Sequence, residues 1–266
     1  MRKSTTSVGI RRVTRSGSQM DTDLVATEEP LEIRIDGRSV AITMRTPGHD
    51  AELTAGFLVT EGVIDGPDDL RAMAHVDDPG DPKGNTIDTV LASGVPMTRR
   101  HAADRALFAS SSCGVCGKAT IDRLIVDCEP ITSRISPSVD VILGLPEKLR
   151  EAQKTFEQTG GLHAAALFDE RGHLEILRED IGRHNAVDKV IGWRLQQDAM
   201  PIDDRILLVS GRAGFEIIQK ALVARIGVVA AVGAPSSMAV QLAEESGMLI
   251  VGFLRNGRYN EYGQQQ

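Results

Sequence analysis

The sequence predicts an α/β protein with a smaller β-rich lobe over residues 21–108 and a larger α/β lobe over residues 109–266. Two observations lead to this prediction. Near the start, alternating apolar and polar residues flank an Asp-Gly pair, which is a strong signal for a β-hairpin. In the last quarter, three short apolar runs alternate with two helical patterns, which predicts a parallel βαβαβ arrangement with right-handed crossovers. A chain of 266 residues is long enough to bury a core in each lobe.

Residues 1–20 differ in composition from the rest of the chain. They contain five basic residues, no acidic residue and few apolar ones. Such a segment cannot bury enough apolar surface to offset the entropy lost on ordering. We therefore expect a disordered basic tail.

The β-rich lobe begins with the runs LEIRI and SVAITM, which flank the Asp-Gly pair at 36–37 and form the expected hairpin. A helical pattern of apolar residues follows over DAELTAGFLVT. His49, immediately before that helix, is interpreted as a capping or surface residue. Residues 65–85 are rich in Asp, Pro and Gly and predict a loop, and NTIDTVLAS predicts a further strand.

In the larger lobe, LPEKLREAQKTFEQTGG predicts a helix closed by its two glycines. LHAAALFDERGHLEILRED predicts a second hairpin, opened by His163, which is interpreted equally well as a strand-edge hydrogen bonder or a site residue. The next helix is expected to begin at Asn185, a good N-cap. Arg183 and His184 would then lie at a helix N-terminus, where backbone N–H groups attract anions.

The last quarter of the chain predicts a binding site, because ligands of parallel sheets bind beyond the carboxyl ends of the strands. Small residues, serines suited to helix capping and three arginines follow the three strands, which favours a phosphate-bearing ligand. Neither a Walker A loop nor a GxGxxG sequence is present. Ordinary βα turns with solvated arginines are the alternative. The candidates are Ser210, Gly211, Arg212, Gly233, Ser236, Arg255, Asn256, Gly257 and Arg258.

Charge and composition exclude several classes of protein. A net charge of −7 argues against a general nucleic-acid binder, because phosphates would be repelled. No apolar run approaches the roughly 18 to 20 residues of a membrane span, and the basic N-terminus lacks the apolar segment of a signal peptide. Three cysteines, two of them in a CxxC, fit a reducing compartment. We expect a cytoplasmic protein that binds no membrane.

The chemistry is predicted to reside in SSSCGVCGK, residues 110–118, where serines and glycines surround Cys113 and Cys116. An exposed loop next to Lys118 and a helix start favours reactive thiolates, so a nucleophile that carries sulfur is the leading interpretation. Three others stay open. A structural zinc site would need Cys128 and a distant His, a thioredoxin-like dithiol would need a preceding strand, and the thiols could be inert.

Several segments together resemble the FdhD family of formate dehydrogenase accessory sulfurtransferases. They are CGVCGK, GGLHAAAL, REDIGRHNAVDKVIG, VSGRAGFEIIQKA and FLRNGR, within a resemblance that extends from residue 24 to residue 262. Their order and joint presence make the resemblance specific. It implies a three-layer larger lobe like that of cytidine deaminase, in a protein that forms homodimers.

The same resemblance implies a sulfur carrier. It would accept persulfide sulfur from a cysteine desulfurase and pass it to the molybdenum cofactor, Mo-bis(molybdopterin guanine dinucleotide), before that cofactor enters formate dehydrogenase. The persulfide position maps to Cys113, with Cys116 as a second thiol. The cofactor-binding motif maps to Phe253 through Arg258, and so adds Phe253 and Leu254 to the candidates. GDP is the expected mimic of the ligand, and no structural metal is expected.

Two other functions are the alternatives. Zinc deaminases carry HxE followed by PCxxC, whereas here the CxxC comes first and Ala165 stands where the Glu belongs. A non-catalytic chaperone for a guanine nucleotide or cofactor is the other, with incidental cysteines.

Overall fold

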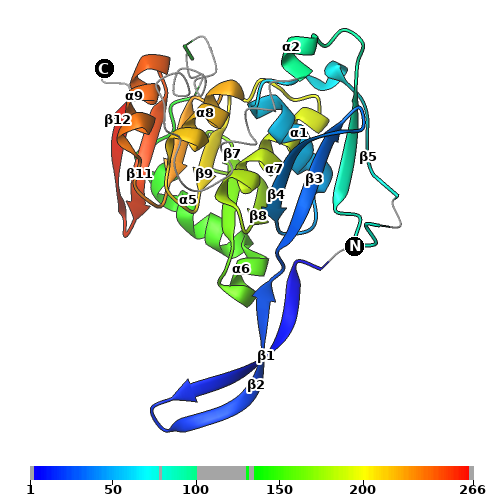
Figure 1. Cartoon of the computed structure of the whole chain (residues 1–266). Helices are drawn as coiled ribbons and strands as arrows, with labels where there is room; N and C mark the ends of the chain where they lie inside the picture. Colours follow the sequence, from blue (N-terminus) through cyan, green and yellow to red (C-terminus); the bar gives the residue numbers. More distant parts are fainter. Residues whose placement is uncertain (1–2, 78–79, 101–129, 132–134, 264–266) are drawn as a thin grey trace.

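The structure is a computed structural model that describes residues 3–77, 80–100, 130–131 and 135–263 (Figure 1). Within these ranges the strands form a two-stranded hairpin, a four-stranded sheet and a six-stranded sheet. The architecture is mixed α/β, with a small N-terminal β region and a larger mixed sheet with helices, as predicted. The lobe boundary predicted at 108/109 lies outside the described residues.

The basic N-terminal segment is a β-hairpin, and the predicted disordered tail is wrong here. Strands β1 (Thr5–Thr14) and β2 (Gly17–Ala26) pair antiparallel over all ten residues of each. The β-branched residues of TTSVGIRRVT favour an extended backbone, a local preference that a count of apolar and charged residues overlooks. The hairpin projects away from the body of the molecule (Figure 1).

The four-stranded sheet has the order β4-β3-β6-β5. Its strands are β3 (Glu29–Ile35), β4 (Arg38–Arg45), β5 (Leu70–His75) and β6 (Thr86–Leu91). The predicted hairpin is confirmed, because β3 and β4 are joined by an Asp-Gly turn with positive φ at both positions. Strand β5 lies inside the predicted loop. It is a largely exposed edge strand and lacks the apolar alternation on which strand prediction depends.

The six-stranded sheet has the order β12-β11-β10-β9-β7-β8. Strands β9, β10 and β11 are parallel, which confirms the predicted βαβαβ unit, while β8 and β12 are antiparallel neighbours at the two edges. The strands are β7 (His163–Phe168), β8 (Leu174–Asp180), β9 (Ile206–Val209), β10 (Val228–Ala231), β11 (Leu249–Arg255) and β12 (Arg258–Gly263). The sequence analysis did not predict β12, whose polar sequence RYNEYG carries no apolar pattern.

Helices cover both faces of the six-stranded sheet (Figure 1). Alternate strand residues face α7, α8 and α9 on one side and α5 on the other, as Leu207 and Leu208 of β9 illustrate. The helices are α1 (Asp50–Thr60), α2 (Met97–Arg100), α5 (Val139–Ala152), α6 (Lys154–Thr159), α7 (Arg183–Gln196), α8 (Phe215–Val223) and α9 (Ser237–Ser246), with a 3-10 turn η1 at Pro67–Asp69.

Helix α7 begins two residues earlier than the sequence predicts. Gly182 occupies the N-cap, so Arg183 is the first helical residue and Asn185 lies inside the helix. The side chain of Asn185 instead donates to Met44 O (2.8 Å) and to Asp180 Oδ1 (2.9 Å). A side chain suited to capping is thus used to join α7 to the first lobe.

Helices α1 and α7 cross at two glycines and join the lobes. A Cβ on Gly56 would lie 1.8 Å from Asp188 O, and a Cβ on Gly192 would lie 1.8 Å from Glu52 O. The two backbones are therefore in direct contact at positions where no side chain fits. Glu52 of α1 also accepts two hydrogen bonds from Arg178 of β8, at 2.5 and 2.7 Å.

Buried ion pairs lie on both sides of this crossing. Lys220 of α8 contacts Asp188 Oδ2 at 3.0 Å and donates to Thr60 Oγ1 at 2.8 Å. Asp180 is fully buried and contacts Lys189 Nζ at 2.7 Å. Such charges are tolerated in a core only when paired, so each helix must keep its position relative to its neighbours.

Substituting either glycine by alanine is expected to lower the free energy of unfolding by about 2 kcal/mol or more, because the methyl group would overlap a neighbouring backbone. Urea denaturation of Gly56→Ala and Gly192→Ala measures this. Gly144→Ala in α5 is the matched control. A Cβ there meets nothing within 4 Å, and stability should stay equal or rise. Equal stability of all three variants would contradict the close crossing.

Candidate functional site

The candidate site lies at the edge of the six-stranded sheet where the carboxyl ends of β9 and β10 adjoin the start of β7. Strand β7 runs antiparallel to β9, so its first residue, His163, lies beside the loop that follows β9. Ser210 in that loop donates from its N–H to Ala164 O and accepts from the Ala164 N–H at Oγ, both at 2.9 Å. The two segments are therefore fastened together.

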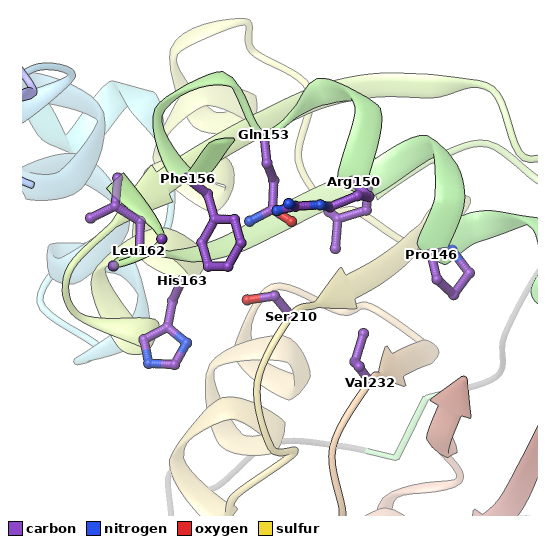
Figure 2. Close-up of a pocket in the computed structure, with 11 residues that line it drawn as sticks. Pro146, Arg150, Gln153, Phe156, Leu162, His163, Ser210 and Val232 are labelled. Carbon is purple, nitrogen blue, oxygen red and sulfur yellow. The ribbon is translucent and has the colours of Figure 1, made fainter. Parts of the chain in front are cut away.

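A cavity of about 580 Å³ adjoins this edge (Figure 2). Residues of α5, α6 and the junction between them line it on one side, and Ser210 and Val232 line it on the other. Three lining residues were missed by the sequence analysis: Arg150, Gln153 and Phe156. The apolar pattern predicts one helix across this segment, whereas the structure breaks it at Gln153. In the sequence, only Phe156, an aromatic residue among polar neighbours, marks this segment.

Glu179 of β8 holds α6 in place. Its carboxylate accepts hydrogen bonds from the backbone N–H groups of Thr155 (2.9 Å) and Phe156 (2.7 Å). Strand β2 of the N-terminal hairpin packs against the same helix. The cavity wall that carries Phe156 is therefore supported by both the sheet and the hairpin.

The structure brings four predicted site residues into direct contact. Gly233 N–H donates to Gly211 O, and Phe253 N–H donates to Gly233 O, both at 2.9 Å. A Cβ on Gly233 would lie 2.8 Å from Gly211 O and 3.1 Å from Arg212 Cα. Only glycine lets the loops approach so closely. We call Ser210, Gly211, Arg212, Gly233 and Phe253 the rim.

Two other candidates have structural tasks. Ser236 is the N-cap of α9, and its Oγ accepts a hydrogen bond from the Ala239 N–H at 3.3 Å. Leu254 is only 1% exposed and packs in the core on the side of α5. Its side chain therefore does not lie on the surface with its neighbours in the predicted motif.

The remaining candidates form the turn between β11 and β12. Asn256 and Gly257 have positive φ, and Arg255 and Arg258 pair across the turn. Both arginines are exposed. Arg212, Arg255 and Arg258 form no ion pair with any other residue that the structure describes. Exposed guanidinium groups without a carboxylate partner remain available to an anion.

Cys113 and Cys116 lie outside the described residues. Their role as sulfur-carrying thiols, and the alternatives of a zinc site, a dithiol or inert thiols, therefore stay predictions. Within the described ranges, no group of three or more His, Cys, Asp or Glu side chains could hold a metal ion. No helix in those ranges is long and apolar enough to cross a membrane.

Charged groups of both signs lie near His163: Arg183 and His184, and against them the carboxylate of Asp180. Burial lowers the pKa of this imidazole, and the nearby Arg183 and His184 lower it further. Arg183, the first residue of α7, therefore lowers the pKa of a residue at the start of β7. A Cβ on Gly211 would lie 3.4 Å from His163 Nδ1, so the ring also borders the rim. A lowered pKa favours the neutral imidazole, in which one ring nitrogen accepts a hydrogen bond.

Comparison with known proteins assigns the chain to a protein family. The sequence profile of the FdhD/NarQ family matches residues 26–266. The chain belongs to the FdhD/NarQ family. A solved structure with 23% identity, described as a formate dehydrogenase accessory protein from Desulfotalea psychrophila, superimposes with a TM-score of 0.77 over 98% of both chains. This likeness supports the mixed α/β fold.

Curated relatives within the family are considerably closer in sequence. The sulfur carrier protein FdhD of Streptomyces avermitilis is 50% identical over 90% of this chain and 87% of its own length. The proteins of the same name from Mycobacterium tuberculosis and Sulfurisphaera tokodaii are 47% and 43% identical, over 90% and 96% of this chain. They match 90% and 95% of their own lengths, so the similarity is not confined to one lobe.

The pKa of His163 is expected to rise toward its ordinary value of 6.5 in Arg183→Gln, because a nearby positive charge is removed. Histidine NMR titration measures it directly. Arg171→Gln, in the turn at the opposite end of β7, is the control and should leave the titration unchanged. In the unaltered protein His163 favours folding above about pH 6.5 and loses that contribution as the pH falls, because the unfolded chain binds the proton more readily. A titration unaffected by Arg183→Gln would contradict this coupling.

Proposed function

We propose that the chain is a cytoplasmic sulfur carrier, a sulfurtransferase that serves the maturation of formate dehydrogenase. The observation that carries this proposal is the 50% identity, over 90% of the chain, to a protein named sulfur carrier protein FdhD. The described fold agrees, because it places the rim, with Arg212, and the turn with Arg255 and Arg258 at the carboxyl ends of parallel strands, where ligands of such sheets bind. The larger lobe, a mixed sheet with helices on both faces, is proposed to have the cytidine-deaminase-like fold that the resemblance implies.

The first step is sulfur acceptance at Cys113. Its thiolate attacks the outer sulfur of the persulfide held by a cysteine desulfurase. A new S–S bond forms on Cys113, the S–S bond of the desulfurase breaks, and the desulfurase cysteine leaves as a thiolate. Cys116, three positions further along the same glycine-rich sequence, is the second thiol. No metal is required for this exchange, since both thiols act as nucleophile or leaving group.

The second step is delivery to the molybdenum cofactor, Mo-bis(molybdopterin guanine dinucleotide). The rim and the turn at Arg255 and Arg258 bind the phosphates of this substrate and so hold its metal end in a fixed orientation. GDP would occupy the same positions as a mimic. A homodimer, with cysteine desulfurase and formate dehydrogenase as partners, completes the proposal. A guanine-nucleotide chaperone would use the same rim, so the cysteine decides between the two functions.

Incubation with a cysteine desulfurase and cysteine is expected to add one sulfur atom to the chain. Cys113→Ala should abolish the adduct, whereas the exposed substitution Arg171→Gln should keep it. Mass spectrometry under non-reducing conditions detects the adduct. Absence of the adduct on the unaltered protein would refute the carrier function and favour the chaperone.

Arg255→Ala and Arg258→Ala should each weaken GDP binding by about tenfold, because one charge-assisted contact to phosphate is lost. Calorimetric titration measures the dissociation constant. Arg38→Ala, a basic residue of the other sheet, is the control. Unchanged affinity in both turn variants would remove this turn from the site.

A further inference from the structure

We propose that the cavity beside the rim is a base-binding subsite, in which Gln153 recognises a planar 2-amino-4-oxopyrimidine ring. Guanine and pterin share this ring, so the cavity would take one heterocyclic end of a ligand whose phosphates lie on the rim. The inference rests on the proposed function for the identity of the ring. The cavity, its amide and its aromatic wall are observations that stand apart from that function.

Gln153 is the observation that points to a ligand. The residue is only 5% exposed, yet no hydrogen bond joins its side chain to another residue in the described part of the chain. It lines the cavity, and Figure 2 shows its amide group pointing inward from the break between α5 and α6. The donor and the acceptor of this amide therefore face the cavity and are available to a ligand there.

The chemistry of the amide defines the edge that it can recognise. Its Oε1 accepts a hydrogen bond and its Nε2 donates one. A 2-amino-4-oxopyrimidine presents a ring N–H donor next to an oxo acceptor, so the two groups pair through two parallel hydrogen bonds. This bidentate arrangement fixes the orientation of the ring in its own plane, and with it the direction in which the rest of the ligand leaves the cavity.

An aromatic wall supplies the stacking surface. The guanidinium carbon of Arg150 lies 4.6 Å from the ring centroid of Phe156, and both side chains line the cavity. A planar base stacks on such a surface with a gain of about 1 to 3 kcal/mol. The cavity volume of about 580 Å³ lies within the range of ligand pockets.

Ser210 connects this subsite to the rim. Its Oγ accepts from the Ala164 N–H and has no other bond to a residue that the structure describes, so the hydroxyl hydrogen is available to a ligand. Ser210 also precedes Gly211 and Arg212, and Val232 in the cavity precedes Gly233. At the ends of both β9 and β10, a residue that lines the cavity is thus followed directly by a residue of the rim. One ligand can therefore contact the cavity and the rim together.

GDP titration of the full chain tests the inference with three variants. Gln153→Leu keeps a similar volume and removes both hydrogen bonds, so affinity should fall about tenfold or more. Gln153→Glu should stay within about threefold of the unaltered protein, because a carboxylate accepts from both the ring N–H and the 2-amino group of guanine. Phe156→Leu should lose about tenfold through stacking. Gln241→Leu, the same substitution at an exposed position of α9, is the control.

A second arm distinguishes the two sources of the ring. If the guanine of GDP occupies the cavity, biopterin will compete with GDP, because it presents the same edge to Gln153. If the cavity takes the pterin and GDP lies on the rim alone, biopterin will bind without displacing GDP, and Gln153→Leu will weaken biopterin binding only. ADP should bind Gln153→Glu more weakly than the unaltered protein, because its edge places an acceptor against the carboxylate. Thermal melting reports whether Gln153→Leu folds. If it does not, Phe156→Leu and Gln153→Glu still carry the test.

The failure of this inference differs from the failure of the proposed function. Binding of both GDP and biopterin that is unchanged in Gln153→Leu and Phe156→Leu overturns the base subsite, and it leaves the rim intact if Arg255→Ala still weakens GDP binding. Binding of neither GDP nor biopterin by the unaltered protein overturns both the subsite and the cofactor step. The sulfur adduct on Cys113 is measured separately and depends on neither result.

Discussion

The crossing of α1 and α7 is the constraint on which the rest of the structure depends. Gly56 and Gly192 let the two helix backbones touch, at positions where a Cβ would lie 1.8 Å from a carbonyl oxygen. This backbone contact brings the four-stranded and six-stranded sheets together around one large core. Buried charge pairs such as Lys220–Asp188 then fix the register, because separating the partners would leave an unpaired charge in the core.

This constraint also determines where the candidate site lies. The carboxylate of Asp180, at the end of β8, accepts from Thr46 N–H of the first lobe and from Gly182 N–H before α7. The start of α7 is thereby anchored next to the start of β7, which brings Arg183 to His163. The first lobe contributes no residue to the rim. Its contact with Asp180 nevertheless fixes the start of α7, whose Arg183 lowers the pKa of His163 beside the rim.

Much of the fold was predictable from sequence because its signals are local. The Asp-Gly turn, the βαβαβ alternation and Gly160 at the end of α6 all appear within a few residues of chain. The strands β5 and β12 were not predictable, since LRAMAH and RYNEYG carry no clear apolar alternation. The rim loops follow from strand ends, but Gln153 does not. Its significance arises only when α5 and α6 are folded against β9, which no periodicity reveals. Cys113 and Cys116 lie outside the described residues.

The support of α6 has a consequence for recognition. Glu179 accepts hydrogen bonds from the first turn of α6, and β2 packs against the same helix. The wall that carries Phe156 is therefore ordered before a ligand binds. The conformational entropy of that wall is lost during folding and need not be lost again on association. A pocket built in this way is preorganised. Its selectivity comes from a fixed shape that complements the ligand, and the chain does not rearrange to accommodate ligands of another shape.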